Sequence, residues 1–193
     1  FTVSGSELAI TSAGVLTFKA APDYETKSTY TATVTASDGT NTTTQDITIN
    51  ITNVNEAPAF TSGANFSAAE NQTSIGTVTA TDADGDSVTF TVSGSELAIT
   101  SAGVLTFASA PDYETKSTYT ATVTASDGTN TSTQDITVNV TNINDGSPVF
   151  TSSATFSAAE NQTAIGTVTA TDADGDSVTF TVSGSELAIT SAG

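Results

Sequence analysis

One block of sequence occurs three times along this chain. Residues 1–14 (FTVSGSELAITSAG) are repeated without a change at 90–103 and at 180–193. Successive copies therefore start at Phe1, Phe90 and Phe180. Self-similarity at a nearly fixed spacing is typical of an array in which each repeat folds into the same unit. Such an array favours a structural role, because a single catalytic pocket would gain nothing from being copied in this way.

The composition excludes most kinds of catalysis. The chain contains no His, Cys, Met or Trp. It therefore lacks an imidazole base near neutral pH, a thiol nucleophile and the soft ligands that many transition metals prefer. Hydrolysis by a Ser-His-Asp or a Cys-His arrangement is excluded. We expect a protein that is not an enzyme.

The charge is strongly negative. The chain has 3 Lys and Arg against 21 Asp and Glu, a formal net charge of −18. This charge would repel nucleic acids and anionic membrane surfaces, whereas hard cations and basic partners remain possible. No apolar run approaches the roughly 20 residues of a membrane-spanning helix, so we expect no direct membrane insertion. The first residue, Phe1, lies inside a repeat, and we expect the chain to be a segment of a longer protein.

Two Pro-containing joints divide the chain. They are residues 53–58 (NVNEAP) and residues 142–148 (NINDGSP), and the second is one residue longer than the first. Boundaries at these joints predict one complete module over 57–146. Residues 1–56 are then the C-terminal part of a preceding module, and residues 147–193 are the N-terminal part of a following module.

Alternation of apolar and polar residues predicts β-strands throughout the complete module. An apolar face of Tyr119, Ala121, Val123 and Ala125 stands opposite a face of Thr residues over 118–124. Period-two alternation is typical of half-buried strands, and Thr suits the outer face of a pleated sheet. The seven expected strands are marked by Phe60 with Phe66, Gly76 with Val78 and Ala80, Val88 with Phe90 and Val92, Leu97 with Ile99, Leu105 with Phe107, the 118–125 run, and Ile136 with Val138 and Val140.

Seven short strands in about 90 residues, separated by turn signals such as Asp127-Gly128, indicate an immunoglobulin-like sandwich. The fold class that we predict is all-β, with tandem seven-stranded sandwiches arranged end to end. The buried Trp and paired Cys of antibody domains are missing.

The acidic residues are concentrated in the turns and joints. Loops gather at the two ends of a sandwich, so we expect these carboxylates to meet where consecutive modules join. Several carboxylates within a few ångströms repel one another unless their pKa values rise or a divalent cation neutralises them. Calcium accepts 6 to 8 oxygen ligands in flexible geometry and suits such a cluster.

Five motifs in this order resemble the cadherin-like tandem repeats of large bacterial extracellular, adhesin-type proteins. Cadherins have a Glu in the first strand, a DxD after the second, an acidic pair before the sixth, an Asp in the turn after the sixth, and a DxNDNxPxF linker. The matching residues are Glu70, Asp82 with Asp84, Asp112 with Glu114, Asp127, and the linker from Asn142 to Phe150. The resemblance covers essentially the whole chain.

The resemblance implies that Ca²⁺ binds at the joints. At the first joint the implied ligands are Asp23, Glu25, Asn53, Asn55, Glu56, Asp82, Asp84 and Asp127. At the second joint they are Glu70, Asp112, Glu114, Asn142, Asn144, Asp145, Asp172 and Asp174. The chain departs from the family where Asn53 and Asn142 replace the first linker Asp, and we expect this loss of charge to weaken binding.

Two other motifs are weaker. Asp82-x-Asp84-x-Asp86 imitates the start of an EF-hand loop, but Ser87 and Ser93 occupy the positions of the required Gly and Glu, so an EF-hand is rejected. Four segments match the N-glycosylation sequon, at Asn41, Asn71, Asn130 and Asn161, and chance matches are frequent in a chain so rich in Asn and Thr.

The sequence thus predicts a non-enzymatic, calcium-stiffened repeat region of a giant extracellular adhesin or surface filament. We expect it to be secreted or on the cell surface, with neighbouring modules and other copies of the chain in a filament as partners. An alternative is a self-assembling fibre in which the partial modules of neighbouring chains complete each other by strand exchange. A third hypothesis, that each module is a lectin or homophilic binder, lacks the exposed aromatic cluster of a sugar-binding surface.

Overall fold

The computed structural model describes residues 1–192, and every regular element in them is a β-strand. The predicted all-β class is confirmed. Within these residues we find no helical segment with the length and apolar character that spanning a bilayer requires.

The described residues group into two compact units. The first comprises residues 1–60, 80–89 and 125–132, and the second comprises 61–79, 90–124 and the residues from 133 onward. Two segments of the predicted module 57–146, namely 80–89 and 125–132, therefore belong to the same unit as residues 1–60. The repeat boundaries that the sequence suggests stay a prediction.

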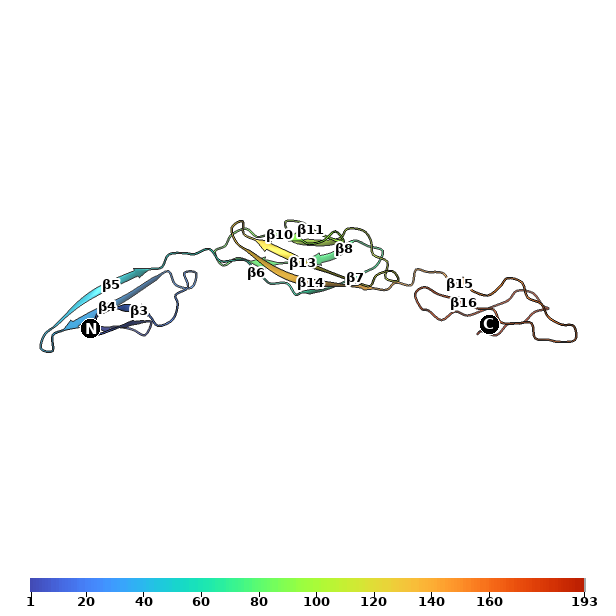
Figure 1. The fold of residues 1–193 in the computed structure, drawn as a ribbon, viewed down its shortest axis with the longest axis horizontal. Helices are drawn as coiled ribbons and strands as arrows, with labels where there is room; N and C mark the ends of the chain where they lie inside the picture. The colour runs from blue at the N-terminus through green and yellow to red at the C-terminus, as the bar shows by residue number, and fades with distance from the viewer. Residues whose placement is uncertain (193) are drawn as a thin grey trace. The chain divides into compact units, whose positions relative to one another are not determined.

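Residues 1–50 form five strands in two sheets. The order β1-β4-β5 describes one sheet, and β2 pairs with β3 in the other. Strands β4 and β5 pair in antiparallel register from Thr29 opposite Asn50 to Ser37 opposite Thr42, and they appear as a long hairpin in Figure 1. The bounds of the five strands are β1 Thr2–Val3, β2 Leu8–Ile10, β3 Leu16–Phe18, β4 Thr29–Ser37 and β5 Thr42–Asn50.

Nine strands follow between residues 59 and 141. They are β6 Ala59–Phe60, β7 Asn65–Ala69, β8 Ser74–Thr77, β9 Ala80–Thr81, β10 Thr89–Val92, β11 Leu97–Ile99, β12 Val104–Phe107, β13 Thr118–Ser126 and β14 Thr131–Thr141. Their main sheets have the orders β10-β13-β14-β7 and β11-β12-β8, and β6 pairs with β9. Two further strands, β15 Val149–Phe150 and β16 Ala170–Thr171, pair with each other.

The first two predicted strands are each divided in two. The first becomes β6, which pairs antiparallel with β9, and β7, which pairs in parallel with β14. The second becomes β8 and β9, separated at Thr79, whose carbonyl accepts hydrogen bonds from Thr61 N at 2.8 Å and Ser62 N at 3.2 Å. The first predicted strand thus changes its pairing partner from β9 to β14 between β6 and β7, and the second predicted strand is interrupted between β8 and β9, beside that change.

The predicted apolar faces meet in one core. Leu105 of β12 in the three-stranded sheet and Val123 and Val138 of the four-stranded sheet are all fully buried. Phe107 packs edge to face against Tyr119, with ring centroids 5.0 Å apart. The Thr residues of β13 alternate with these positions and remain at least partly exposed, as the pattern predicts.

Candidate metal centres

Asp23 and Asp112 shape the turns that precede β4 and β13. In the first turn Asp23 Oδ1 accepts hydrogen bonds from Glu25 N at 3.0 Å and Thr26 N at 3.2 Å, and Oδ2 accepts one from Thr26 Oγ1. These bonds, led by that of the Thr26 hydroxyl, lower the pKa of Asp23. Asp112 makes the corresponding bonds to Thr115, which lower its pKa in the same way. Each turn sets the direction of the Glu that follows two residues later.

The loop after β9 is held together by its own first carboxylate. Asp82 Oδ1 accepts hydrogen bonds from Asp84 N at 3.0 Å and Asp86 N at 3.2 Å, which fixes the backbone on both sides of Gly85. The other oxygen, Asp82 Oδ2, is buried and has no hydrogen-bond partner among residues 1–192. The repeat copy of this loop behaves alike, except that the buried oxygen without a partner is Asp174 Oδ1.

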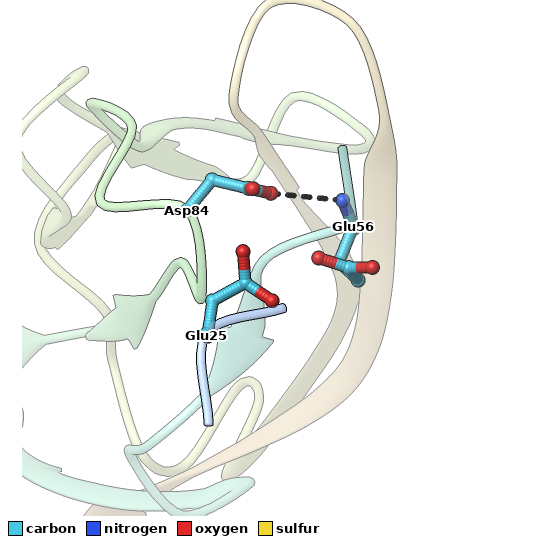
Figure 2. Close-up of side chains that lie close together, drawn as sticks. All are labelled: Glu25, Glu56 and Asp84. Atoms are coloured by element: carbon cyan, nitrogen blue, oxygen red, sulfur yellow. Dashed lines mark hydrogen bonds between the residues drawn. The ribbon is translucent and has the colours of Figure 1, made fainter. Parts of the chain in front are cut away.

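Three carboxylates from three separate segments meet in the first compact unit. Glu25, Glu56 and Asp84 each offer an oxygen within 4.8 Å of the other two, and Figure 2 shows them around one point. The Glu56 backbone N–H donates to Asp84 Oδ2 at 3.0 Å, and Asn53 Nδ2 donates to Asp84 Oδ1 at 2.7 Å. We call this group the first acidic cluster.

The charges of the first acidic cluster repel one another. Desolvation raises the pKa of Glu25, and the negative charges of Glu56 and Asp84 raise it further. The pKa of Glu56 is raised by desolvation first and then by Asp84. The pKa of Asp84 is lowered, chiefly because the Glu56 N–H and the Asn53 amide donate to its carboxylate. Protonation of the two Glu residues therefore relieves repulsion, whereas protonation of Asp84 breaks hydrogen bonds.

Asp127 lies in the same compact unit but outside this cluster. Its Oδ1 accepts hydrogen bonds from Thr129 N and Asn130 N, both at 2.6 Å, and these bonds lower its pKa. Asn55 Nδ2 donates to Asp127 Oδ2 at 2.9 Å, and Asn130 Nδ2 donates to the Asn55 carbonyl at 2.7 Å. Asn53 and Asn55 thus turn amide nitrogens toward carboxylates, and either would need to present its side-chain oxygen to ligate a cation.

The second acidic cluster lies in the second compact unit and is centred on Glu114. One group of carboxylates consists of Glu114 with Glu70 and Asp112, and another of Glu114 with Asp145 and Asp174. Desolvation raises the pKa of Glu114, and the charges of Glu70, Asp174 and Asp112 add to this rise.

Three amide groups donate to members of the second acidic cluster, and a fourth donates to Asp176. Gly146 N donates to Asp174 Oδ2 at 2.9 Å, and Asn142 Nδ2 donates to the Asp174 carbonyl at 3.4 Å. Asn71 donates to Asp145, and Asn144 donates to Asp176. Sequence reasoning missed Asn71, Asn130 and Asp176 as members of these networks. The third acid of the repeated DADGD segment was the available signal for Asp176.

The two linkers supply their carboxylates from different positions. Glu56 N and Gly146 N make the same hydrogen bond to the second Asp of the following DADGD loop. These two residues therefore correspond, and the extra residue of the second linker comes before Gly146. The linker carboxylate is then Glu56 in the first cluster and Asp145, one position earlier, in the second.

Eight of the sixteen predicted ligands lie in these carboxylate groups: Glu25, Glu56, Glu70, Asp84, Asp112, Glu114, Asp145 and Asp174. Asp23, Asp82, Asp127, Asp172 and the four linker Asn residues lie outside the groups, mostly as hydrogen-bond partners of their members. A hard cation fits the donor set, because every donor is an oxygen. Two buried carboxylate oxygens also lack a partner among residues 1–192: Oδ1 of Asp174, a member of the second cluster, and Oδ2 of Asp82, which lies two residues before Asp84. The ligand role of all sixteen residues stays a prediction.

The pKa values of three Glu residues are raised and those of two Asp residues are lowered, so we predict that stability passes through a maximum as the pH falls. We expect the chain, in chelator, to become more stable as the pH falls from 7 through the raised pKa values of Glu25, Glu56 and Glu114, because repulsion is relieved. Below about pH 4 it should lose stability, because Asp84 and Asp127 have lowered pKa values and bind protons more readily when unfolded. Thermal unfolding between pH 7 and 3 measures this, and a continuous decrease from pH 7 would contradict it.

Comparison with known proteins finds related immunoglobulin-type and cadherin domains. Residues 55–141 match the family model of the bacterial Ig domain (Big_9). This chain is 39% identical to cadherin EGF LAG seven-pass G-type receptor 1 of Mus musculus in an alignment of 113 residues. The alignment covers 52% of this chain and 4% of the mouse protein.

Solved cadherin structures share the fold. Mouse cadherin-23 EC22-24 is 25% identical with a TM-score of 0.59, covering 89% of this chain and 64% of that one. The protocadherin gammaB7 EC3-6 cis-dimer is 25% identical to this chain with a TM-score of 0.62, and the match covers 89% of this chain and 50% of that one. The matched domain, the repeated sequence and these likenesses show cadherin-like tandem repeats with an immunoglobulin-type fold, and the family model itself covers residues 55–141, less than half of the chain.

Proposed function

We propose that this chain is a non-enzymatic structural region of a large extracellular adhesin or surface filament, stiffened by calcium at the joints between its repeats. The observation that carries the proposal is the convergence of carboxylates from three separate segments at Glu25, Glu56 and Asp84. Cadherin-like repeats indicate an adhesive or structural role in general. The absence of His and Cys from the sequence agrees with a role other than catalysis.

Calcium at these clusters would neutralise charges that otherwise repel. Glu25, Glu56 and Asp84 would hold it in the first cluster, and Glu114, Asp145 and Asp174, with Glu70 and Asp112 beside them, would hold it in the second. When bound, the cation supplies positive charge that links oxygens of the linker to oxygens of the loops on either side. In this proposal the joints separate modules at 1–56, 57–146 and 147–193, and the ion limits the bending between them.

An extracellular setting and self-association are part of the proposal. Several similar structures are described as cadherin extracellular domains, and one is a cis-dimer of protocadherin gammaB7. We infer that the partners of this chain are its neighbouring modules and other copies of the same chain, on the cell surface or in a secreted filament. Its net charge of −18 disfavours nucleic acid as a partner.

Calcium titration of the 193-residue chain tests this function. We expect calcium to raise the unfolding temperature, because an ion that binds only the folded arrangement stabilises it by about 2.7 kcal/mol per site at 100 times its dissociation constant. Glu56→Gln should weaken the effect, whereas Glu186→Gln, which removes an exposed acid outside both clusters, should not. Calorimetry with and without chelator measures the change.

The same samples, measured by small-angle X-ray scattering, test the stiffening. Calcium should narrow the distribution of end-to-end dimensions, and identical unfolding temperatures and dimensions in calcium and chelator would contradict the proposed function.

The scattering mass also tests the strand-exchange alternative. Ile165 and Leu187 are about half exposed, whereas their repeat copies Ile75 and Leu97 are more deeply buried. Strands that bury Ile165 and Leu187 could come from the same polypeptide or from a second copy of the chain. A scattering mass above that of a monomer would favour the second copy.

A further inference from the structure

Glu70 is the most deeply buried charged side chain of residues 1–192. Its exposed fraction is 2%, and no other Asp, Glu or Lys in this part of the chain is buried to that degree. It directly follows the last residue of β7 (Asn65–Ala69), which pairs in parallel with β14. Burial of a carboxylate is costly unless hydrogen bonds replace its water, so the partners of Glu70 decide what it does.

Each carboxylate oxygen of Glu70 accepts a backbone N–H from a different segment. Tyr113 N donates to Oε2 at 2.8 Å, and Ile143 N donates to Oε1 at 2.7 Å. Hydrogen bonds to a carboxylate are stronger than those between neutral groups. The side chain of Glu70 thus joins the end of β7 to the turn before β13 and to the linker after β14.

The backbone around Glu70 reaches the same two segments. Glu70 N donates to the Thr141 carbonyl at 3.2 Å, and Asn71 N donates to the Pro111 carbonyl at 3.0 Å. The ladder between β7 and β14 ends at Ala69 opposite Thr141. The carboxylate therefore continues the attachment of the linker for two residues beyond the ladder, up to Ile143.

We propose that Glu70 is a latch that works without metal, a positioning residue that fixes the linker and the preceding turn to the end of β7. Glu114 directly follows Tyr113, and Asp145 lies two residues after Ile143, so the latch fixes the backbone beside two carboxylates of the second acidic cluster. A role as calcium ligand alone requires none of these backbone hydrogen bonds. The latch does not depend on the proposed function, because it acts in the absence of calcium.

The two roles predict opposite results for Glu70→Gln in chelator. If Glu70 were only a ligand, neutralising one of several crowded carboxylates would leave the stability unchanged or raise it. A latch loses one acceptor, because Gln has a single oxygen and its amide nitrogen would face a backbone N–H. We expect the unfolding temperature in chelator to fall by about 4 to 8 °C. An unchanged or higher value would overturn the proposal.

The repeats provide matched controls. Glu160 is the copy of Glu70 in an identical SAAENQT segment, but its side chain is exposed. Glu160→Gln should therefore leave the unfolding temperature in chelator unchanged. Glu114→Gln, which removes a carboxylate from the same cluster, should leave it unchanged or raise it, and a decrease equal to that of Glu70→Gln would overturn the assignment of the latch to Glu70.

Hydrogen exchange of the unmodified chain gives a measurement that requires no variant. In chelator, the amide protons of Tyr113 and Ile143 should exchange as slowly as those of the β7–β14 ladder, although both side chains are over a third exposed. Their repeat copies Tyr24 and Val54 should exchange faster, since no carboxylate takes the place of Glu70 there among the described residues. Equal rates for the two pairs would overturn the proposal, whether or not the chain binds calcium.

Discussion

Replacing Gly103 with Ala should destabilise the chain by about 3 kcal/mol or more. Gly103 has φ +87°, a conformation that costs other residues about 1 kcal/mol or more. A Cβ atom there would lie 2.2 Å from the Val78 carbonyl oxygen and 3.3 Å from the Phe90 ring. The contact with Val78 is with backbone, which is itself fixed by a hydrogen bond from Val78 N to the Gly103 carbonyl. The clash therefore forces the strands apart, which adds the cost of an overpacked core.

Two other glycines, Gly14 and Gly94, allow the cost of the positive φ to be measured without the contact with the Val78 carbonyl. Gly14 is the repeat copy of Gly103 with nearly the same φ, +85°, but the three atoms nearest to its Cβ would all belong to the Phe1 ring, the first at 3.6 Å. Gly94 has φ +80° and nothing within 4 Å. We expect Gly14→Ala and Gly94→Ala to cost about 1 kcal/mol each, the strain alone. Urea unfolding measures all three, and equal values for Gly103→Ala and Gly14→Ala would show that the close approach of the Val78 carbonyl has no effect.

The strands that alternate most regularly were the ones that sequence could predict. Val123 and Ala125 in β13 and Ile136 and Val138 in β14 lie on the buried faces that the period-two pattern indicates. The division of the first two strands was not predictable in this way. It depends on the pairing of β7 with β14, which are about 70 residues apart in sequence, and no local pattern encodes a pairing of that range.

The acidic residues of the candidate sites could be found from sequence, but their individual roles could not. The order of acids along the chain indicated which joint each belongs to, and Glu25, Glu56 and Asp84 do lie together. Sequence could not separate Asp23, whose oxygens form hydrogen bonds within its own turn, from Glu25, whose oxygen faces the cluster. Sequence also could not show that the linker carboxylate lies one position earlier at Asp145 than at Glu56. The second linker is one residue longer than the first, and aligning the two sequences does not fix where the extra residue lies.

The repeats also allow the contribution of burial to be measured at one sequence position. Leu105 in β12 and Leu16 in β3 occupy the same place in the segment SAGVLTF, but Leu105 is fully buried, whereas Leu16 is half-buried. In β12 the residue Leu105 lies between Ile99 of β11 and Gly76 of β8, whereas β3 pairs with β2 alone. The N-terminal copy thus has one neighbouring strand in the sheet where the other has two.

Leu105→Ala should therefore cost about 3 to 5 kcal/mol, and Leu16→Ala about 1 to 2 kcal/mol. The first change removes a side chain that is enclosed on all sides and leaves a cavity, whereas water can reach the space that the second change opens. Urea unfolding followed by circular dichroism measures both. Similar costs would mean that β3 has the same cover as β12 in solution, which is what the strand-exchange alternative predicts from a second copy of the chain. The same pair of variants thus reports on the strand-exchange alternative through stability alone.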